Sequence, residues 1–200
     1  MQKTRQRVCL SGLCSSLLGL TLLFSQFILA GQANAQALHR SAATKTAKSA
    51  TAYMFGNIKI PGGKVILVVL SKQWMYVFQD GQEIGDQAVT TGQPSLPTPT
   101  GIYHIFLKKS PDTFHSPWPK GSKYYYPPTQ VTYAMEWHSG GYFIHDSWWH
   151  TAYGPGTNDW HDDPTYGWQW GSHGCISVPL QAAAWLYQWA PIGTTVDVVS

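Results

Sequence analysis

Cysteine is scarce in this chain, and its distribution limits what the protein can do. The 200 residues contain three cysteines, and two of them, Cys9 and Cys14, lie close to the N-terminus. Cys175 is the only cysteine after them. If the N-terminal segment is removed, no disulfide can form within the chain, so Cys175 is a reactive thiol, a partner in an intermolecular bridge or a small buried apolar group.

A net positive charge is missing from the part of the chain that we expect to fold. Six of the 13 Lys and Arg residues precede residue 57, whereas all 10 Asp and Glu residues follow it, so residues 57–200 carry a net charge of −3. A phosphate-binding surface needs clustered positive charge on a folded face. The overall charge of +3 therefore gives no support for nucleic-acid binding, and we expect none.

Two common catalytic signatures are also absent. No G-x-S-x-G elbow is present, which disfavours a serine hydrolase of the lipase type. The sequence "WHDDP" groups His161, Asp162 and Asp163, and His150 could join them, but these residues lack a recognised metal-ligand spacing and Asp-Asp-Pro is a common turn. We therefore expect no metal ion and no other cofactor.

The N-terminus has the order of a secretory signal peptide. Basic residues at Lys3, Arg5 and Arg7 precede an apolar stretch around 17–24, and a small-residue site ends at Ala35. We predict a signal peptide over residues 1–35 and an extracytoplasmic location in a bacterium: secreted, periplasmic or bound to the cell wall. The alternative is an uncleaved anchor, and only then would the protein contact the membrane.

Residues 36–56 are rich in Ala, Ser, Thr and Lys, which predicts a flexible linker, and residues 57–200 form one domain. β-branched and aromatic residues with Gly and Pro between them indicate a mainly β domain, a sandwich. We read residues 93–100 and 110–128 as loops. The expected strands are residues 64–70, 73–79, 85–91, 101–108, 131–137, 140–149 and 194–199.

One segment, residues 178–190, has helical character. Pro179 suits a first turn, the alanines favour helix, and Pro191 ends it. We therefore expect one helix directly after Cys175. Backbone N–H groups at a helix N-terminus stabilise a thiolate, and a base is still needed because free thiols ionise near pH 8.5. His173 and His145 are the two candidates, and spacing alone does not choose between them.

Four short sequences resemble a known family in content and order. They are "TPTG" (98–101), "FIHD" (143–146), "SHGC" (172–175) and "GTTVDVV" (193–199). Together they resemble the L,D-transpeptidase catalytic domain, the YkuD-like family, and its actinobacterial branch in particular. The resemblance covers most of residues 63–200 and implies the β-sandwich of that family.

The resemblance implies a cysteine acyltransferase that acts on peptidoglycan stem peptides. Cys175 would attack the carbonyl before the terminal D-Ala, release D-Ala and form a thioester. An amine of a neighbouring stem peptide would then give a 3-3 cross-link, whereas water would make the protein an L,D-carboxypeptidase. The family also implies inhibition by carbapenem-type β-lactams.

The resemblance assigns a role to each site residue. His145 would donate and accept the proton, and His173 would line the pocket and orient the reacting groups. Backbone N–H groups near Gly174 and Cys175 would form the oxyanion hole. The expected oxyanion and substrate pocket comprises Ser172, Gly174, Ser177 and Asp146.

Three features depart from the family. Ser177 stands where Arg or Asn is common, and serine cannot grip a carboxylate as arginine does. Asp146 stands where Gly or Ser is usual, and the connection between His145 and Ser172 is longer than usual. A catalytically impaired peptidoglycan-binding module is therefore an alternative, as is a zinc peptidase that uses His145, His173 and Cys175 as metal ligands.

Tryptophan is concentrated near the expected site. Six of the 10 tryptophans lie within residues 137–170, most of them in the long connection 146–171. Either they pack between this connection and the sandwich, or they form an aromatic platform for sugar rings or the stem peptide.

Overall fold

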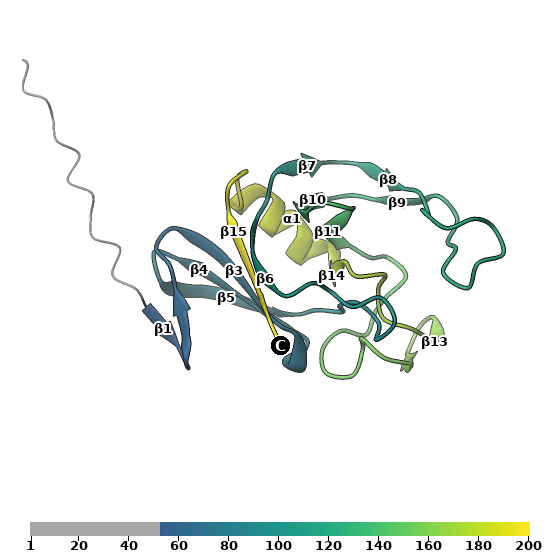
Figure 1. Cartoon of the computed structure of the whole chain (residues 1–200), viewed down its shortest axis with the longest axis horizontal. Coiled ribbons are helices and arrows are strands. Elements are labelled where there is room, and N and C mark those ends of the chain that lie inside the picture. Colours follow the sequence, from purple (N-terminus) through teal and green to yellow (C-terminus); the bar gives the residue numbers. More distant parts are fainter. Residues whose placement is uncertain (1–52) are drawn as a thin grey trace, which may run out of the picture. The chain divides into compact units, whose positions relative to one another are not determined.

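Two β-sheets enclose the main apolar core. The computed structural model describes residues 53–200, so the predicted signal peptide and the linker up to residue 52 lie outside the described residues. The larger sheet has five strands, and β15 runs parallel to β3 while the other pairs are antiparallel (Figure 1). Its order is β5 (Gln82–Ala88), β4 (Trp74–Gln79), β3 (Lys64–Val69), β15 (Thr195–Val199) and β6 (Gly101–His104).

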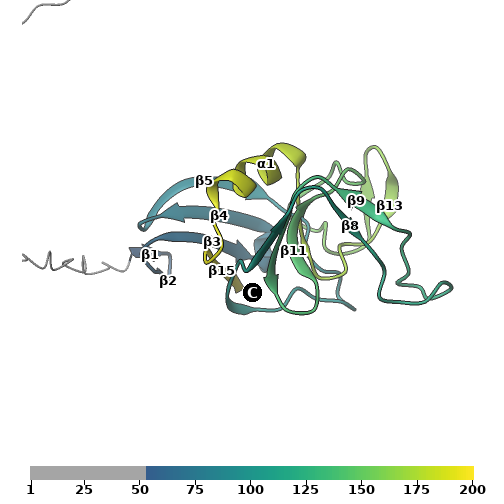
Figure 2. The same ribbon diagram turned by 90° about the horizontal axis from the view of Figure 1, so that it is seen from above.

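The second sheet has four strands and carries the sequence motifs of interest. Its order is β14 (Ile176–Val178), β11 (Tyr142–Asp146), β10 (Ala134–His138) and β7 (Leu107–Lys109). β14 runs parallel to β11, which is antiparallel to β10. Figure 2 shows this sheet beside the five-stranded one. Because "FIHD" forms β11 and "SHGC" leads into β14, the two motifs lie on neighbouring strands.

The core lies between the sheets and includes the helix α1 (Leu180–Trp189). Ile66 and Val77 enter it from the large sheet, Ile144 and Ile176 from the small sheet, and Leu186 from α1. Residues two apart on a strand point to the same face. The alternate residues of β11 and β14 therefore face away from this core.

A smaller apolar cluster lies on the other face of the five-stranded sheet. Val65, Leu67 and Val69 of β3 pack there with Ile60. They are covered by a hairpin of β1 (Tyr53–Phe55) and β2 (Ile58–Ile60). β1 lies in the predicted linker 36–56, so the last residues of that segment are ordered: Phe55 packs against the rings of Tyr76 and Phe78.

Two short pairs of strands and one 3-10 turn lie around the sheets. β8 (Asp112–Phe114) pairs with β9 (Thr129–Val131), and β12 (His161–Asp163) pairs with β13 (Gly167–Gln169). A single 3-10 turn, η1 (Leu70–Lys72), joins β3 to β4. β8 falls in the segment 110–128 that the sequence predicts to be a loop.

The predicted fold class, mainly β with one helix, is confirmed, but two boundaries differ. The predicted strand 101–108 divides into β6 and β7, which belong to different sheets. At the crossing point Ile105 is buried and its N–H donates to the Thr194 carbonyl, whereas the next N–H, of Phe106, donates to the Glu136 carbonyl of the other sheet.

The predicted helix 178–190 is present as α1, but it begins at Leu180 and does not follow Cys175 directly. Strand β14 lies between them, and its residues Ile176 and Val178 are buried. Three extended residues span about 10 Å, so the helix N-terminus does not provide the N–H groups next to the thiol. Within residues 53–200, no helix has the length and apolar character needed to cross a membrane.

Candidate active site

Cys175 lies at the entrance to β14, and backbone hydrogen bonds fix the segment on both sides of it. The Thr90 and Ser177 backbones exchange two hydrogen bonds of 3.0 and 2.8 Å. On the other side of Cys175, the N–H of Gln93 donates to the Ser172 carbonyl (2.9 Å). The thiol itself contacts the start of β11: Sγ lies 3.5 Å from the Gly141 carbonyl and accepts the Phe143 N–H at 3.4 Å.

The residues of "SHGC" form a tight turn before the nucleophile. Ser172 Oγ donates to the Cys175 carbonyl (2.6 Å) and accepts the N–H of Gly174 (3.0 Å). Gly174 has φ +109°, and a Cβ there would lie 2.6 Å from the Tyr142 ring. Only glycine fits such a position without strain.

This turn corrects one detail of the expected oxyanion hole. Because the Gly174 N–H already donates to Ser172 Oγ, it is not free to hold a developing oxyanion. The Gly174 carbonyl accepts the hydroxyl of Thr98 (2.9 Å), whose Oγ1 also accepts the Gly92 N–H. "TPTG" therefore contributes by bracing the turn that carries the nucleophile.

The resting thiol is neutral. Burial raises the pKa of Cys175 to about 11, the hydrogen bond from the Phe143 N–H opposes this, and the charge of Glu136 adds to it. A thiol with that pKa is protonated at pH 7, so attack on a carbonyl requires a base that takes the proton.

His145 on β11 can act as that base. Its Nδ1 lies 2.8 Å from the Asp146 carbonyl, and because a carbonyl only accepts, Nδ1 carries the proton and Nε2 is the basic nitrogen. Burial lowers the pKa of His145, although the carbonyl and charge of Asp146 oppose the shift. The imidazole is therefore neutral near pH 7 and able to take a proton. Phe114 and Trp149 pack against the ring.

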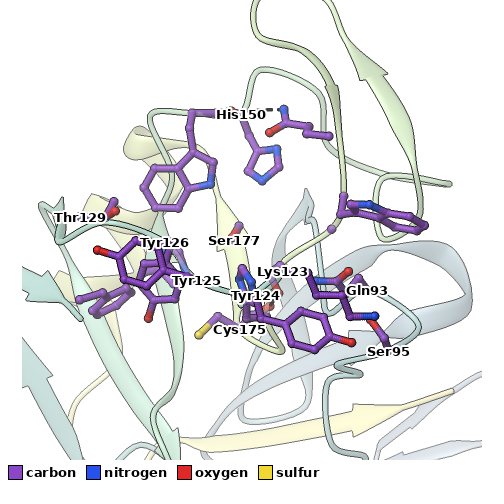
Figure 3. A pocket seen from close by; sticks show the side chains of 18 of the residues that line it. Gln93, Ser95, Lys123, Tyr124, Tyr125, Tyr126, Thr129, His150, Cys175 and Ser177 are labelled. Carbon is purple, nitrogen blue, oxygen red and sulfur yellow. Dashed lines mark hydrogen bonds between the residues drawn. The ribbon is translucent and has the colours of Figure 1, made fainter. Parts of the chain in front are cut away.

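A single cavity of about 740 Å³ contains both groups. Figure 3 shows it, with His150 at the top, Cys175 below and Ser177 between them in this view. Five of the predicted site residues line this cavity: Ser172, His173, Cys175, Ser177 and His145.

Ser177 lies beside His145 in the cavity wall. The two residues are register partners on the parallel strands β14 and β11, and both line the cavity. Ser177 is 1% exposed, and its hydroxyl has no hydrogen-bond partner in the structure. A buried hydroxyl without a partner is costly. This hydroxyl is therefore uncommitted in the wall of the cavity.

Asp146 does not line the cavity, contrary to our expectation. Its carboxylate accepts the backbone N–H groups of Thr132 (2.9 and 3.0 Å) and Tyr133 (2.6 Å), which lie on the far side of β11 from His145. Neighbouring residues of a strand point to opposite faces. Asp146 therefore reaches the site through its carbonyl, which fixes His145, and its side chain secures the start of β10.

His173 lines the cavity within an aromatic cluster. Its ring centroid lies 5.3 Å from those of Trp118 and Tyr126 and 6.4 Å from that of Tyr124. Burial lowers the pKa of His173, and a hydrogen bond with the Tyr124 backbone opposes the shift. This packing gives His173 a fixed orientation at the cavity.

Sequence reasoning missed several residues that complete the cavity. Lys123 and the three tyrosines Tyr124–Tyr126 come from the segment between β8 and β9. Trp148 and Trp149, which the sequence raised as part of a possible aromatic platform, follow β11. The "YYY" run in a proline-rich segment was a signal, because apolar rings in a surface loop need something to pack against.

The tryptophans of residues 137–170 serve different purposes. Trp137 is 1% exposed and packs in the core. Trp148, Trp149 and Trp170 line the cavity. Trp160 contacts the rings of Trp168 and Trp170, with centroids 5.8 and 5.3 Å apart. Whether these rings bind sugars stays a prediction.

A family comparison identifies this arrangement. The family model described as "L,D-transpeptidase catalytic domain" (YkuD) matches residues 63–198. The chain belongs to the L,D-transpeptidase catalytic-domain family. No curated protein matches the chain.

Solved structures of L,D-transpeptidases share the fold. An L,D-transpeptidase from Mycobacterium smegmatis is similar with a TM-score of 0.58 and 21% identity, over 74% of this chain and 65% of that one. An L,D-transpeptidase in complex with imipenem gives a TM-score of 0.58 and 22% identity, over 72% of this chain and 64% of that one.

A cysteine-to-serine variant of the Enterococcus faecium L,D-transpeptidase has a higher identity. It is 28% identical with a TM-score of 0.56, over 68% of this chain and 50% of that one. This chain thus spans one half to two thirds of the length of these relatives. The comparisons support an L,D-transpeptidase-type enzyme.

Proposed function

We propose that this protein is an exported cysteine acyltransferase that removes the terminal D-Ala from peptidoglycan stem tetrapeptides and forms 3-3 cross-links. The observation that carries the proposal is that Cys175 and His145, on neighbouring strands, open onto one cavity. The basic Nε2 of His145 supplies the base that a neutral thiol requires. Family membership supports the reaction class.

The first half of the reaction forms a thioester. The Cys175 sulfur attacks the carbonyl carbon before the terminal D-Ala, and the thiol proton passes to His145 Nε2. The C–N bond then breaks, His145 returns the proton to the leaving amine, and D-Ala departs. The N–H of Cys175 itself is our candidate for the oxyanion donor, since that of Gly174 is engaged.

The second half transfers the acyl group to an acceptor. An amine of a second stem peptide attacks the thioester, His145 accepts its proton, and the thiol is regenerated as the cross-link forms. Water in place of the amine gives a tripeptide, the L,D-carboxypeptidase reaction. Trp148, Trp149 and Tyr124–Tyr126 give the cavity apolar walls on which a stem peptide can pack.

We also propose that carbapenem-type β-lactams acylate Cys175. One of the structural relatives is in complex with imipenem, and opening a β-lactam ring by a thiol is the same acyl transfer without a leaving group. Because the sequence predicts a signal peptide, we propose that the reaction takes place outside the cytoplasm, where peptidoglycan is assembled.

Product analysis tests the proposal. Purified protein is incubated with disaccharide-tetrapeptide, with and without excess acceptor, and the products are identified by mass spectrometry beside Cys175→Ala. We expect a cross-linked dimer and free D-Ala with the parent protein and neither with the variant. Tripeptide alone would assign the carboxypeptidase reaction. No Cys175-dependent product would refute the enzyme and favour an impaired peptidoglycan-binding module.

A further inference from the structure

A second cluster of chemically capable side chains lies in the long connection between β11 and β14. It comprises His150, His161 and Asp163, and the potential ligand atoms of all three lie within 4.8 Å of one another. Asp162, which the sequence places beside them, is exposed and outside the cluster. The cluster joins the chain just after β11 to the hairpin β12–β13.

Two imidazole nitrogens in this cluster are buried and have no hydrogen-bond partner. They are Nδ1 of His150 and Nε2 of His161. His150 is only 5% exposed, and the two rings lie nearly parallel with centroids 6.0 Å apart. Buried polar atoms without partners are rare, and an ion or a water molecule is the usual explanation.

The tautomer of His161 favours an ion. Its Nδ1 lies 2.9 Å from the Asp159 carbonyl, so Nδ1 is the protonated nitrogen and Nε2 has a free lone pair. Metal-binding histidines commonly donate their other N–H to a backbone carbonyl in this way. A bridging water could also donate to Nε2, whereas an ion would in addition balance the negative charge of the neighbouring carboxylate.

Asp163 is 1% exposed and carries that charge. Although burial opposes ionisation, hydrogen bonds from the Thr151 hydroxyl and from the N–H groups of Thr151, Ala152 and Thr165 hold the pKa of Asp163 below its usual range. These contacts measure between 2.7 and 2.9 Å, and the N–H of Tyr166 donates a further hydrogen bond of 3.0 Å. Ligating carboxylates are typically held by such bonds.

We propose that His150 Nδ1, His161 Nε2 and the Asp163 carboxylate bind a divalent transition-metal ion, zinc by preference, with solvent from the cavity as the fourth ligand. Imidazole and carboxylate donors suit zinc, which takes four ligands in a tetrahedral arrangement. The site adjoins the cavity, because His150 also lines it.

The ion would fix one wall of the active-site cavity. Trp149 and Gln169, which flank the cluster in sequence, line that wall, and the Gln169 side chain donates to the Trp149 carbonyl (3.2 Å). A bound metal would add to the hydrogen bonds that already join the β12–β13 hairpin to the segment after β11. The ion would not take part in thiol acyl transfer, so the site is independent of the function proposed above.

Zinc binding to the untagged Cys175→Ala protein tests the proposal. This background removes the Cys175 thiol, because a thiolate is itself a zinc ligand. We expect one zinc per chain by titration calorimetry and by metal analysis after dialysis, together with a zinc-dependent rise in melting temperature. Neither Mg²⁺ nor Ca²⁺ should displace the ion, because both prefer oxygen ligands.

Matched variants identify the ligands. Thr151→Val removes one hydrogen bond to Asp163 and should weaken zinc binding by about 10–100-fold, the usual cost of losing an outer-shell partner. His161→Gln removes a ligand itself and should weaken zinc binding by more than about 100-fold. His104→Gln, an exposed histidine, should leave affinity unchanged. His150→Gln removes the buried ligand directly. If that variant does not fold, Thr151→Val still tests the site, because Thr151 is exposed. Stoichiometric zinc binding that survives His161→Gln, or no zinc binding, would overturn the proposal and leave a bridging water.

Discussion

His145 and Ser177 face the same cavity from neighbouring parallel strands, and the hydroxyl of Ser177 has no partner there. The position two residues after the nucleophile thus presents one uncommitted hydrogen-bonding group beside the base. A serine in this position can form one neutral hydrogen bond, where an arginine could form a bidentate ion pair with a carboxylate.

Replacing Ser177 separates binding from stability. In Ser177→Ala the free energy of unfolding should stay the same or rise, because an unsatisfied buried hydroxyl costs about 1–3 kcal/mol. The kcat/KM for the tetrapeptide should fall by about 3–10-fold, the value of one neutral hydrogen bond. Thermal unfolding and steady-state kinetics measure both. Ser95→Ala, also on the cavity wall, is the matched control. A less stable protein with unchanged kcat/KM would contradict the role.

Alkylation of Cys175 reports its pKa directly. Because burial raises the pKa to about 11, the rate with iodoacetamide should rise about tenfold per pH unit up to that value. A short peptide thiol should instead level off near pH 8.5. Intact-protein mass against time gives the rate at each pH. A plateau at or below pH 9 would show that the thiol is not held neutral.

The acid limb of the activity profile should report His145. Burial lowers the pKa of this histidine, and the base works only when neutral, so kcat/KM should persist below pH 6.5 and fall only as the pH passes the lowered pKa. Asp146 opposes the shift. Carbapenem acylation rates from pH 4 to 8 measure the profile. A midpoint at or above 6.5 would argue that another group is the base.

Asp146 should matter for stability rather than for substrate binding. Asp146→Ala leaves the N–H groups of Thr132 and Tyr133 without an acceptor, which should lower the free energy of unfolding by roughly 2–6 kcal/mol at about 1–3 kcal/mol per group. Asp162→Ala, at an exposed carboxylate, should change it by less than about 0.5 kcal/mol. Denaturant unfolding compares the two. Equal effects would refute the structural role.

Long periodic segments and the candidate nucleophile were predictable from the sequence. Residues 64–70 and 73–79 were expected as strands, and β3 and β4 occupy 64–69 and 74–79, since β-branched residues between turn signals leave few alternatives. Cys175 was predictable because it is the only cysteine beyond residue 14. The fate of Asp146 could also have been predicted, since strand neighbours point to opposite faces.

The rest depends on contacts that local patterns do not record. β14 has three residues, too few to show a period, so Ile176 and Val178 were read as leading into the helix. β8 pairs with a partner that follows it by about fifteen residues of proline-rich chain. His150 meets His161 and Asp163 only because a hairpin folds back on the segment after β11. No ligand spacing within the sequence predicts that meeting.

The central claim is that Cys175 carries the acyl group during the reaction. The most direct measurement is the intact mass of the protein quenched in acid within seconds of mixing with tetrapeptide, followed by mapping of the modified peptide. We predict a mass increase equal to the substrate minus D-Ala, located on Cys175 and reversed by hydroxylamine. Turnover of the substrate without any adduct on Cys175, or an undiminished adduct in Cys175→Ala, would contradict the account.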